Sequence, residues 1–500
     1  MSHLALLVLQ ISPARAGTQA LYEDAAREFS VPEELLVALA YEASRFDADA
    51  ASAWGGYGLY DLREDDESFG PGLERVSTLL EVSPDELRAR PDLQIRGAAA
   101  LMAWHGRNLY GELPPVQDLE AWAPVVRAFS GRQEGHLQEM FVSVVYEIVQ
   151  DGVYTDSVKQ LPVTVDADAA VFVAPPMASG DYYGNYQFVA ASSSNYSDYS
   201  RDASDISYVV IHTVQGSYSG CISWFQNSSA NVSAHYVVKS SDGQVTQMVW
   251  EEDVGWHAGN WSYNLASVGI EHEGYVDQPD TYYTSAMYEG SAELTADIVE
   301  RNGISLDRSH IIAHSEVPSA THTDPGSGWD WDRYMDLING IDEPNPSAEL
   351  LGVVAVEDIY TGERLSGVTV TLDQTGETDK TDADGWYVFD GLSAGTWSVT
   401  VKVDGYETGT CSKDITTDSG QWWCSMALVP GEPDPQDSDP DPQDDTGPDF
   451  EPGDGIHVPP PGARVGLGDS GGCSASPLPE GQAGLVGIGL LALLGLRRRS

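Results

Sequence analysis

Histidine is concentrated in one part of the sequence, and imidazole is a side chain that binds metals and transfers protons. Seven of the eleven histidines in this 500-residue chain lie between residues 212 and 322. They are His212, His235, His257, His272, His310, His314 and His322. A single histidine in a domain is more often structural, but a cluster of this density among carboxylates indicates a metal site or an acid–base site.

Three residues of this region are candidate metal ligands. His212 ends the apolar run 208–212, and His314 follows a second apolar run, 311–313. Asp324 stands before a proline and a glycine, in a turn that can direct its carboxylate back towards the histidines. Two imidazoles and one carboxylate make a three-ligand zinc site with a fourth position left for water, whose pKa zinc lowers towards about 7. Spacing alone does not specify this set.

A candidate proton carrier lies in the expected strand 267–274. Side chains alternate between the two faces of a strand, so Glu271 and His272 point in opposite directions and only one of them can face the candidate site. Glu273 shares the face of Glu271, and we interpret it as a solvated or supporting carboxylate.

These residues must be positioned by a multidomain chain, because 500 residues are too many for one hydrophobic core. Residues 18–150 have helical periodicity, and 151–203 are rich in Asp, Ser, Tyr and Pro, which is typical of a linker. Residues 204–342 alternate strands with helices, which predicts an α/β domain. Short strand-like runs in 348–430 predict a small antiparallel β-sandwich, and 431–470 are expected to be a disordered, acidic, proline-rich stalk.

The charge of the chain excludes one class of partner. The sequence has 78 acidic and 25 basic residues, a formal net charge of -53. Nucleic-acid binding needs Lys and Arg to neutralise phosphates, so we expect no nucleic-acid partner. The excess of carboxylates is interpreted as a solvated surface. Oligomeric state is not specified by the sequence.

The two ends of the sequence are typical of an exported protein. Residues 1–16 hold a short apolar run and an Ala-x-Ala site, as in a signal peptide. In residues 471–500, Cys473 precedes the apolar stretch 483–496 and three arginines. This arrangement resembles the C-terminal sorting signals of myxobacterial surface proteins, with a plain membrane anchor as the alternative. We expect a protein held at the cell surface or outer membrane, or released, with membrane contact only through this segment.

The four cysteines fit an exported chain. Cys411 and Cys424 lie in two strand-like runs on either side of a turn-rich segment, and we predict a disulfide between them. Cys221 is left without a partner and is interpreted as a small buried residue.

Six short motifs in the histidine-rich region occur in one order. They are residues 211–213, 232–236, 256–260, 268–271, 313–314 and the His-Thr-Asp-Pro-Gly sequence 322–326. Together they resemble the type-2 N-acetylmuramoyl-L-alanine amidase family, whose members include peptidoglycan recognition proteins. The resemblance covers nearly all of 204–342 and implies a central mixed sheet flanked by helices. It also implies zinc-dependent hydrolysis of the peptidoglycan amide bond between N-acetylmuramic acid and L-alanine.

The resemblance assigns roles to five residues. His212, His314 and Asp324 would bind Zn²⁺, and Glu271 would take a proton from water and pass it to the leaving amine. His322 stands where many relatives carry a lysine, and it can still donate a hydrogen bond to the developing oxyanion.

The other histidines receive different interpretations. His257, with Trp256, is predicted to line the substrate groove. His235 is also assigned to the substrate-binding site, which it would support from the sheet, and a satisfied core histidine is the alternative. His272 is expected to be structural, and His310 to lie in a loop.

The N-terminal segment is a second candidate for chemistry. Motifs between residues 29 and 59 resemble lytic transglycosylases of the lysozyme-like fold, whose catalytic glutamate directly precedes a Ser-x-aromatic triplet. Here Ala43 precedes Ser44, and Glu42 lies about 100° further around the helix. Either Glu42 works as a general acid, or the domain has lost catalysis and only binds glycan. We favour the second interpretation. A helical domain unrelated to glycan is the remaining alternative.

The sandwich segment offers no catalytic cluster. Residues 384–389 and 391–396 resemble the carboxypeptidase-regulatory-like family, which implies a spacer or binding module.

The sequence therefore predicts a zinc-dependent N-acetylmuramoyl-L-alanine amidase. One alternative is a protein of the same fold that binds peptidoglycan without cutting it. The other is a bifunctional enzyme that also cleaves glycan through Glu42. The presence of all three ligand positions and of Glu271 favours the amidase.

Overall fold

The computed structural model describes residues 18–431, apart from 65–69, 134, 166–180, 182–185, 319, 341–347 and 417–419. All of these residues belong to one unit of the chain, which ends at residue 434. The predicted signal peptide, the C-terminal segment and all but the first residue of the predicted stalk lie outside the described residues. Within the part of the chain that is described, no helix is both long enough and apolar enough to cross a membrane.

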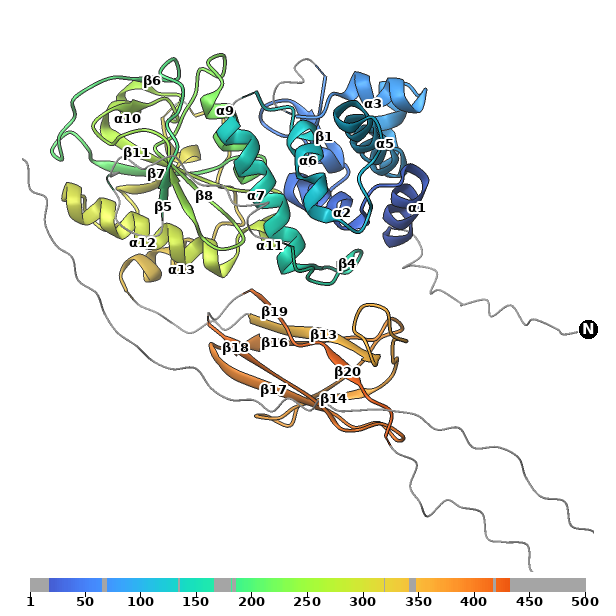
Figure 1. The fold of residues 1–500 in the computed structure, drawn as a ribbon. Helices are drawn as coiled ribbons and strands as arrows, with labels where there is room; N and C mark the ends of the chain where they lie inside the picture. The colour runs from blue at the N-terminus through green and yellow to red at the C-terminus, as the bar shows by residue number, and fades with distance from the viewer. Residues whose placement is uncertain are drawn as a thin grey trace, which may run out of the picture. The chain divides into compact units, whose positions relative to one another are not determined.

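The N-terminal part is helical, as its periodicity predicts (Figure 1). Its helices are α1 (Gln19–Phe29), α2 (Glu33–Ser44), α3 (Leu73–Leu80), α4 (Pro84–Ala89), α5 (Pro91–Tyr110), α6 (Ala123–Phe129) and α7 (Gly135–Asp151). The central helix is α2, whose residues Leu35 to Ala40 are all buried. A helix that is apolar all round must be enclosed, and α1, α5 and α7 pack around it. Short strand pairs, β1 (Gly56–Tyr57) with β2 (Leu62–Arg63) and β3 (Val153–Tyr154) with β4 (Lys159–Gln160), complete this part.

The α/β part is built on a six-stranded mixed sheet with the order β12-β7-β11-β8-β9-β5. Its strands are β5 (Tyr186–Phe188), β7 (Tyr208–Thr213), β8 (Tyr236–Val238), β9 (Val245–Gln247), β11 (Ser267–His272) and β12 (Ile311–Ala313). Neighbouring strands from β12 to β8 run parallel, β8 and β9 run antiparallel, and β9 and β5 run parallel. The predicted central mixed sheet is confirmed.

Helices cover both faces of this sheet. They are α9 (Tyr218–Gln226), α10 (Trp261–Ala266), α11 (Pro279–Tyr282), α12 (Ser285–Asn302) and α13 (Trp331–Ile338) (Figure 1). Val209 and Ile211 of β7 pack with Leu294 of α12, whereas Val237 of β8 packs with Ile222 of α9 on the opposite face. Because side chains alternate along a strand, the apolar residues Val209 and Ile211 face α12. The polar residues at the strand ends, such as His212, lie on the face that α9 covers.

The segment 151–203, predicted to be a linker, packs against the α/β part in its second half and contributes two strands to it. Strand β5 extends the sheet from within it, and β6 (Tyr196–Ser197) pairs with β10 (Val254–Gly255). Arg201 is also buried, and its guanidinium donates to the backbone oxygens of Glu251, Asn264, Leu265 and Ser267. The polar composition of this segment gave no sign of these elements. The segment forms hydrogen bonds with backbone groups of the α/β part and buries little apolar surface, so it lacks the apolar pattern by which strands are predicted.

The third part is a β-sandwich of two four-stranded sheets. Its strands are β13 (Ala348–Val356), β14 (Thr369–Leu372), β15 (Thr378–Lys380), β16 (Trp386–Leu392), β17 (Gly395–Val401), β18 (Gly409–Ile415), β19 (Gln421–Trp423) and β20 (Met426–Leu428). The predicted disulfide is present between Cys411 and Cys424, and Cys221 is free and buried. The expected purely antiparallel arrangement is wrong, because β19 and β20 return beside β13 and pair with it in parallel.

Candidate metal centre and active site

Three side chains converge at the carboxyl ends of two neighbouring parallel strands. His212 is the second-last residue of β7. His314 directly follows β12, which pairs with β7 in parallel register. Asp324 comes from the loop beyond, which a hydrogen bond from the Ser315 N–H to the Asp324 carbonyl oxygen holds in place. The carboxyl ends of adjacent parallel strands share one edge of a sheet, so this topology brings residues 112 positions apart into contact.

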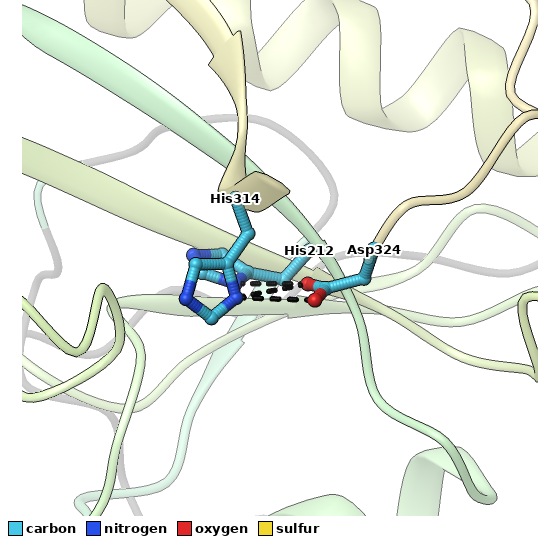
Figure 2. A group of neighbouring side chains, drawn as sticks. All are labelled: His212, His314 and Asp324. Carbon is cyan, nitrogen blue, oxygen red and sulfur yellow. Dashed lines mark hydrogen bonds and ion pairs between the residues drawn. The ribbon is translucent and has the colours of Figure 1, made fainter. Parts of the chain in front are cut away.

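The three side chains have the geometry of a metal centre (Figure 2). One ligand atom from each lies within 4.8 Å of the other two. The Nδ1 atom of His212 is 3.2 Å from Asp324 Oδ2, and the Nδ1 atom of His314 is 3.1 Å from Asp324 Oδ1. All three residues are buried. The structure thus brings the predicted ligand set together.

The protonation states of His212 and Asp324 favour binding of a cation. Burial lowers the pKa of His212 to about 4, although the hydrogen bond to Asp324 opposes the shift. Burial alone would raise the pKa of Asp324, but the hydrogen bonds with His212 and His314 hold that pKa well below its usual range. A neutral imidazole and an ionised carboxylate are the forms that ligate metals. Two nitrogen donors and one oxygen donor fit Zn²⁺ with a position left open.

His257 orients the first ligand. The Nε2 atom of His212 lies 2.9 Å from Nδ1 of His257, and Nε2 of His257 lies 3.3 Å from the Ser267 hydroxyl. This contact fixes the His212 ring with its other nitrogen towards Asp324. The His257 ring fits because residue 269 is glycine: a Cβ there would lie 2.5 Å from the ring. His257 lines the groove, as predicted, and it also supports a ligand, a role that the sequence analysis did not assign.

Glu271 stands beside the candidate ligands. It pairs with His212 in the parallel register of β11 and β7, so both side chains leave the same face of the sheet. Its Oε2 atom is buried without a hydrogen-bond partner. Burial, reinforced by the Asp324 carboxylate, raises the pKa of Glu271 well above its usual range. A neighbouring cation would oppose that shift. His272 faces the other way and contacts Ser291 of α12, which confirms its structural role.

A groove of about 690 Å³ opens onto the centre. His322 lines it, is exposed, and stacks on His314 with ring centroids 5.0 Å apart. Trp256 also lines the groove, and its indole N–H donates to the Ser197 hydroxyl at 3.0 Å. The volume is in the range of small-molecule and cofactor sites.

The prediction that His235 binds substrate is wrong. Its ring is fully buried, its Nδ1 accepts the Gly269 N–H at 3.0 Å, and its Nε2 lies 2.9 Å from the Arg201 guanidinium. His235 therefore belongs to the buried hydrogen-bonded layer beneath the site, which is the second of the two interpretations that the sequence left open.

Glu42 is not placed to cleave glycan. It is 5% exposed, and its Oε1 accepts a hydrogen bond from Ser219 of α9. Arg132 donates to the hydroxyls of Ser219 and Ser223 at 2.9 and 2.6 Å, which places a guanidinium beside the carboxylate. The adjoining cavity of about 20 Å³ has space for a single water. Among the described residues, the space beside Glu42 is too small for a sugar ring, which argues against the bifunctional alternative.

Sequence reasoning missed three aromatic residues of the groove. Trp224 and Phe225 come from α9, and Trp54 comes from the helical part, before α3. The Ala53-Trp54-Gly55-Gly56 sequence contributes only to a resemblance within its own domain. No local pattern signals that its side chains reach a groove more than 150 residues further along the chain.

Comparisons with known proteins agree with this site. Residues 202–327 match the family model of N-acetylmuramoyl-L-alanine amidase, and residues 352–422 match that of the carboxypeptidase regulatory-like domain. The chain is 40% identical over 175 residues to N-acetylmuramoyl-L-alanine amidase A of Achromobacter lyticus, covering 32% of this chain and 96% of the relative. It is 32% identical over 113 residues to the 1,6-anhydro-N-acetylmuramyl-L-alanine amidase AmpD of Haemophilus influenzae, covering 21% and 59%.

Replacing Gly269 by alanine tests the support of His212. The added methyl would displace the His257 ring, and loss of such a partner typically weakens metal binding by about 10–100-fold. Zinc titration against a chromophoric chelator measures this. Gly135→Ala is the matched control, since a Cβ there meets nothing within 4 Å. Equal zinc affinity in both variants would contradict the assigned role of His257.

Replacing Glu42 by alanine tests whether this residue is structural. Loss of its carboxylate removes one of the two acidic groups that act on the buried Arg132 guanidinium, Asp61 being the other, and leaves the Ser219 hydroxyl without its acceptor, which should cost about 1–3 kcal/mol of unfolding free energy. Chemical unfolding measures this against Glu23→Ala, an exposed residue of α1. If the unaltered chain released glycan-cleavage products and the Glu42→Ala variant did not, the structural assignment would be wrong.

Proposed function

The chain belongs to the N-acetylmuramoyl-L-alanine amidase family, and we propose that His212, His314 and Asp324 bind zinc while Glu271 transfers the proton in peptidoglycan amide hydrolysis. The bond cut joins N-acetylmuramic acid to L-alanine. The observation that carries this proposal is the unpartnered carboxylate oxygen of Glu271, buried beside a three-ligand centre in an open groove.

The metal supplies Lewis acidity. Zinc held by two imidazoles and a carboxylate would lower the pKa of a water molecule and polarise a carbonyl oxygen. Asp324 is ionised and His212 is neutral in the structure, so these two ligands already have the protonation states that bind metals. His257 keeps Nδ1 of His212 directed at the centre.

Glu271 carries the proton through the reaction. It accepts a proton from the attacking water as the water oxygen bonds to the amide carbon. It then gives that proton to the nitrogen of alanine as the carbon–nitrogen bond breaks, leaving a carboxylic acid on the muramic acid, which loses its proton to solvent, and a free amine on the peptide. With no protein hydrogen bond to break at Oε2, the carboxylate is free to do both.

His322 and the aromatic walls complete the site. We assign to His322 a hydrogen bond to the oxyanion, which its exposed position over His314 supports. The indoles of Trp224 and Trp256 line the groove and offer flat apolar surface to the substrate.

We also propose that the protein acts outside the cytoplasm, attached through its C-terminal segment or released. The Cys411–Cys424 disulfide supports an oxidising compartment. The signal-peptide-like start and the sorting-signal-like end of the sequence support export. For the helical part we keep the proposal of a lysozyme-like domain without glycan cleavage, which the enclosed Glu42 supports.

The Glu271→Gln variant tests the proton transfer. The amide keeps the size of the side chain and cannot accept the proton, so kcat should fall by about 100–10,000-fold while zinc content stays the same. The assay is chromatography of stem peptides released from purified peptidoglycan, with metal analysis of the same samples. Glu293→Gln, an exposed change on α12, is the control. Unchanged release by zinc-loaded Glu271→Gln would remove Glu271 from the mechanism.

A further inference from the structure

We propose that residues 45–57 of the helical part, here called the bracing loop, carry Ala53 and Trp54 into one wall of the amidase groove, where these two residues determine how tightly the muramyl peptide binds. This inference rests on the proposed function, because it assigns part of the substrate contact to a second domain. The bracing loop touches the two segments that leave the carboxyl ends of β7 and β11, the strands carrying His212 and Glu271.

The first contact is with the segment that follows β7. The Ala53 N–H donates to the Gln215 carbonyl oxygen at 2.8 Å. The Trp54 indole packs on Gly216 and Gly220, where an added Cβ would lie 2.2 Å from the ring at either position. Both glycines thus leave a slot for this indole. The slot begins four residues after His212, so the bracing loop fixes the path of the chain as it leaves the candidate metal centre.

The second contact is with the segment that follows β11. Arg45 pairs with Glu273 at 3.2 Å, and both side chains are less than a tenth exposed. Asp47 accepts a hydrogen bond from Gln278, and Ala50 packs with Tyr275 in a small buried cluster. Glu273 lies two residues after Glu271. Its buried carboxylate holds the bracing loop against the segment that follows β11. Of the two interpretations of Glu273, a supporting carboxylate is therefore confirmed and a solvated one is wrong.

The bracing loop is itself held rigidly. The Trp54 indole N–H donates to Asp61 at 2.6 Å, and the Ser52 hydroxyl accepts the Gly56 N–H at 2.9 Å. Trp54 is 6% exposed. A wall that is ordered before substrate arrives loses little conformational entropy on binding.

This wall faces the substrate. Ala53 and Trp54 line the same groove of about 690 Å³ as Glu271 and the candidate metal ligands. Ala53 is exposed and projects only a methyl group. The two braced segments add Val214, Gln215 and Val276 to the lining, none of which is charged. An uncharged part of the muramyl peptide would pack here, remote from the amide that is cut, and would contribute binding energy rather than chemistry.

Adding a large side chain at position 53 tests this wall without touching the core. Ala53→Trp would narrow the groove, and we expect KM for a soluble muramyl tetrapeptide to rise about 10-fold with kcat little changed, the signature of lost uniform binding. Zinc content and Tm should stay at wild-type values. Ala51→Trp is the matched control, because Ala51 is exposed on the same loop and does not line the groove. It should leave KM unchanged.

The outcomes separate this inference from the proposed function. A KM that rises in Ala53→Trp alone, at constant Tm and zinc content, supports the wall. Equal KM values for both variants and the unaltered chain would overturn it while leaving the amidase intact. Failure of the unaltered, zinc-loaded chain to release stem peptide would instead overturn the proposed function.

Discussion

A buried carboxylate shared between two imidazoles is the interaction on which the rest of this structure depends. Asp324 is held ionised by contacts with both His212 and His314, in a place where an unbalanced charge is costly. The sheet brings the two histidines to Asp324 by placing the carboxyl ends of β7 and β12 side by side in parallel register. His257 and the missing side chain at Gly269 then fix the orientation of one ring. A divalent cation bound there would supply the positive charge that the three donors lack.

The same register connects the metal centre to chemistry and to substrate. β11 lies next to β7, so Glu271 stands beside His212 on the groove face while the apolar residues of both strands pack on α12. The segments that continue from these two strands are braced by the helical part through Trp54 and the Arg45–Glu273 pair. The strands thus hold His212 and Glu271 in fixed positions. The helical part contributes Ala53 and Trp54 to the lining of the groove.

The sequence was informative where chemistry follows local pattern and uninformative where it depends on distant contacts. Apolar runs beside histidines made His212 and His314 candidate ligands, and strand alternation separated Glu271 from His272. The role of Glu42 could not be predicted, because its partner Ser219 is 177 residues away. Strand β5 and Arg201 were hidden in a polar segment, since they satisfy backbone groups rather than bury apolar surface. Family resemblance, rather than spacing, selected His212, His314 and Asp324 as the ligand set.

The most direct test of the account is mass spectrometry of purified peptidoglycan digested by the full chain after chelation and after addition of zinc. The account predicts free stem peptides with an unblocked alanine amine, absent from the chelated sample and restored by zinc, with glycan strands left uncut. Stem peptides released equally after complete metal removal would contradict the role assigned to His212, His314 and Asp324. Muropeptides that stay intact with zinc-loaded protein would contradict amide hydrolysis itself.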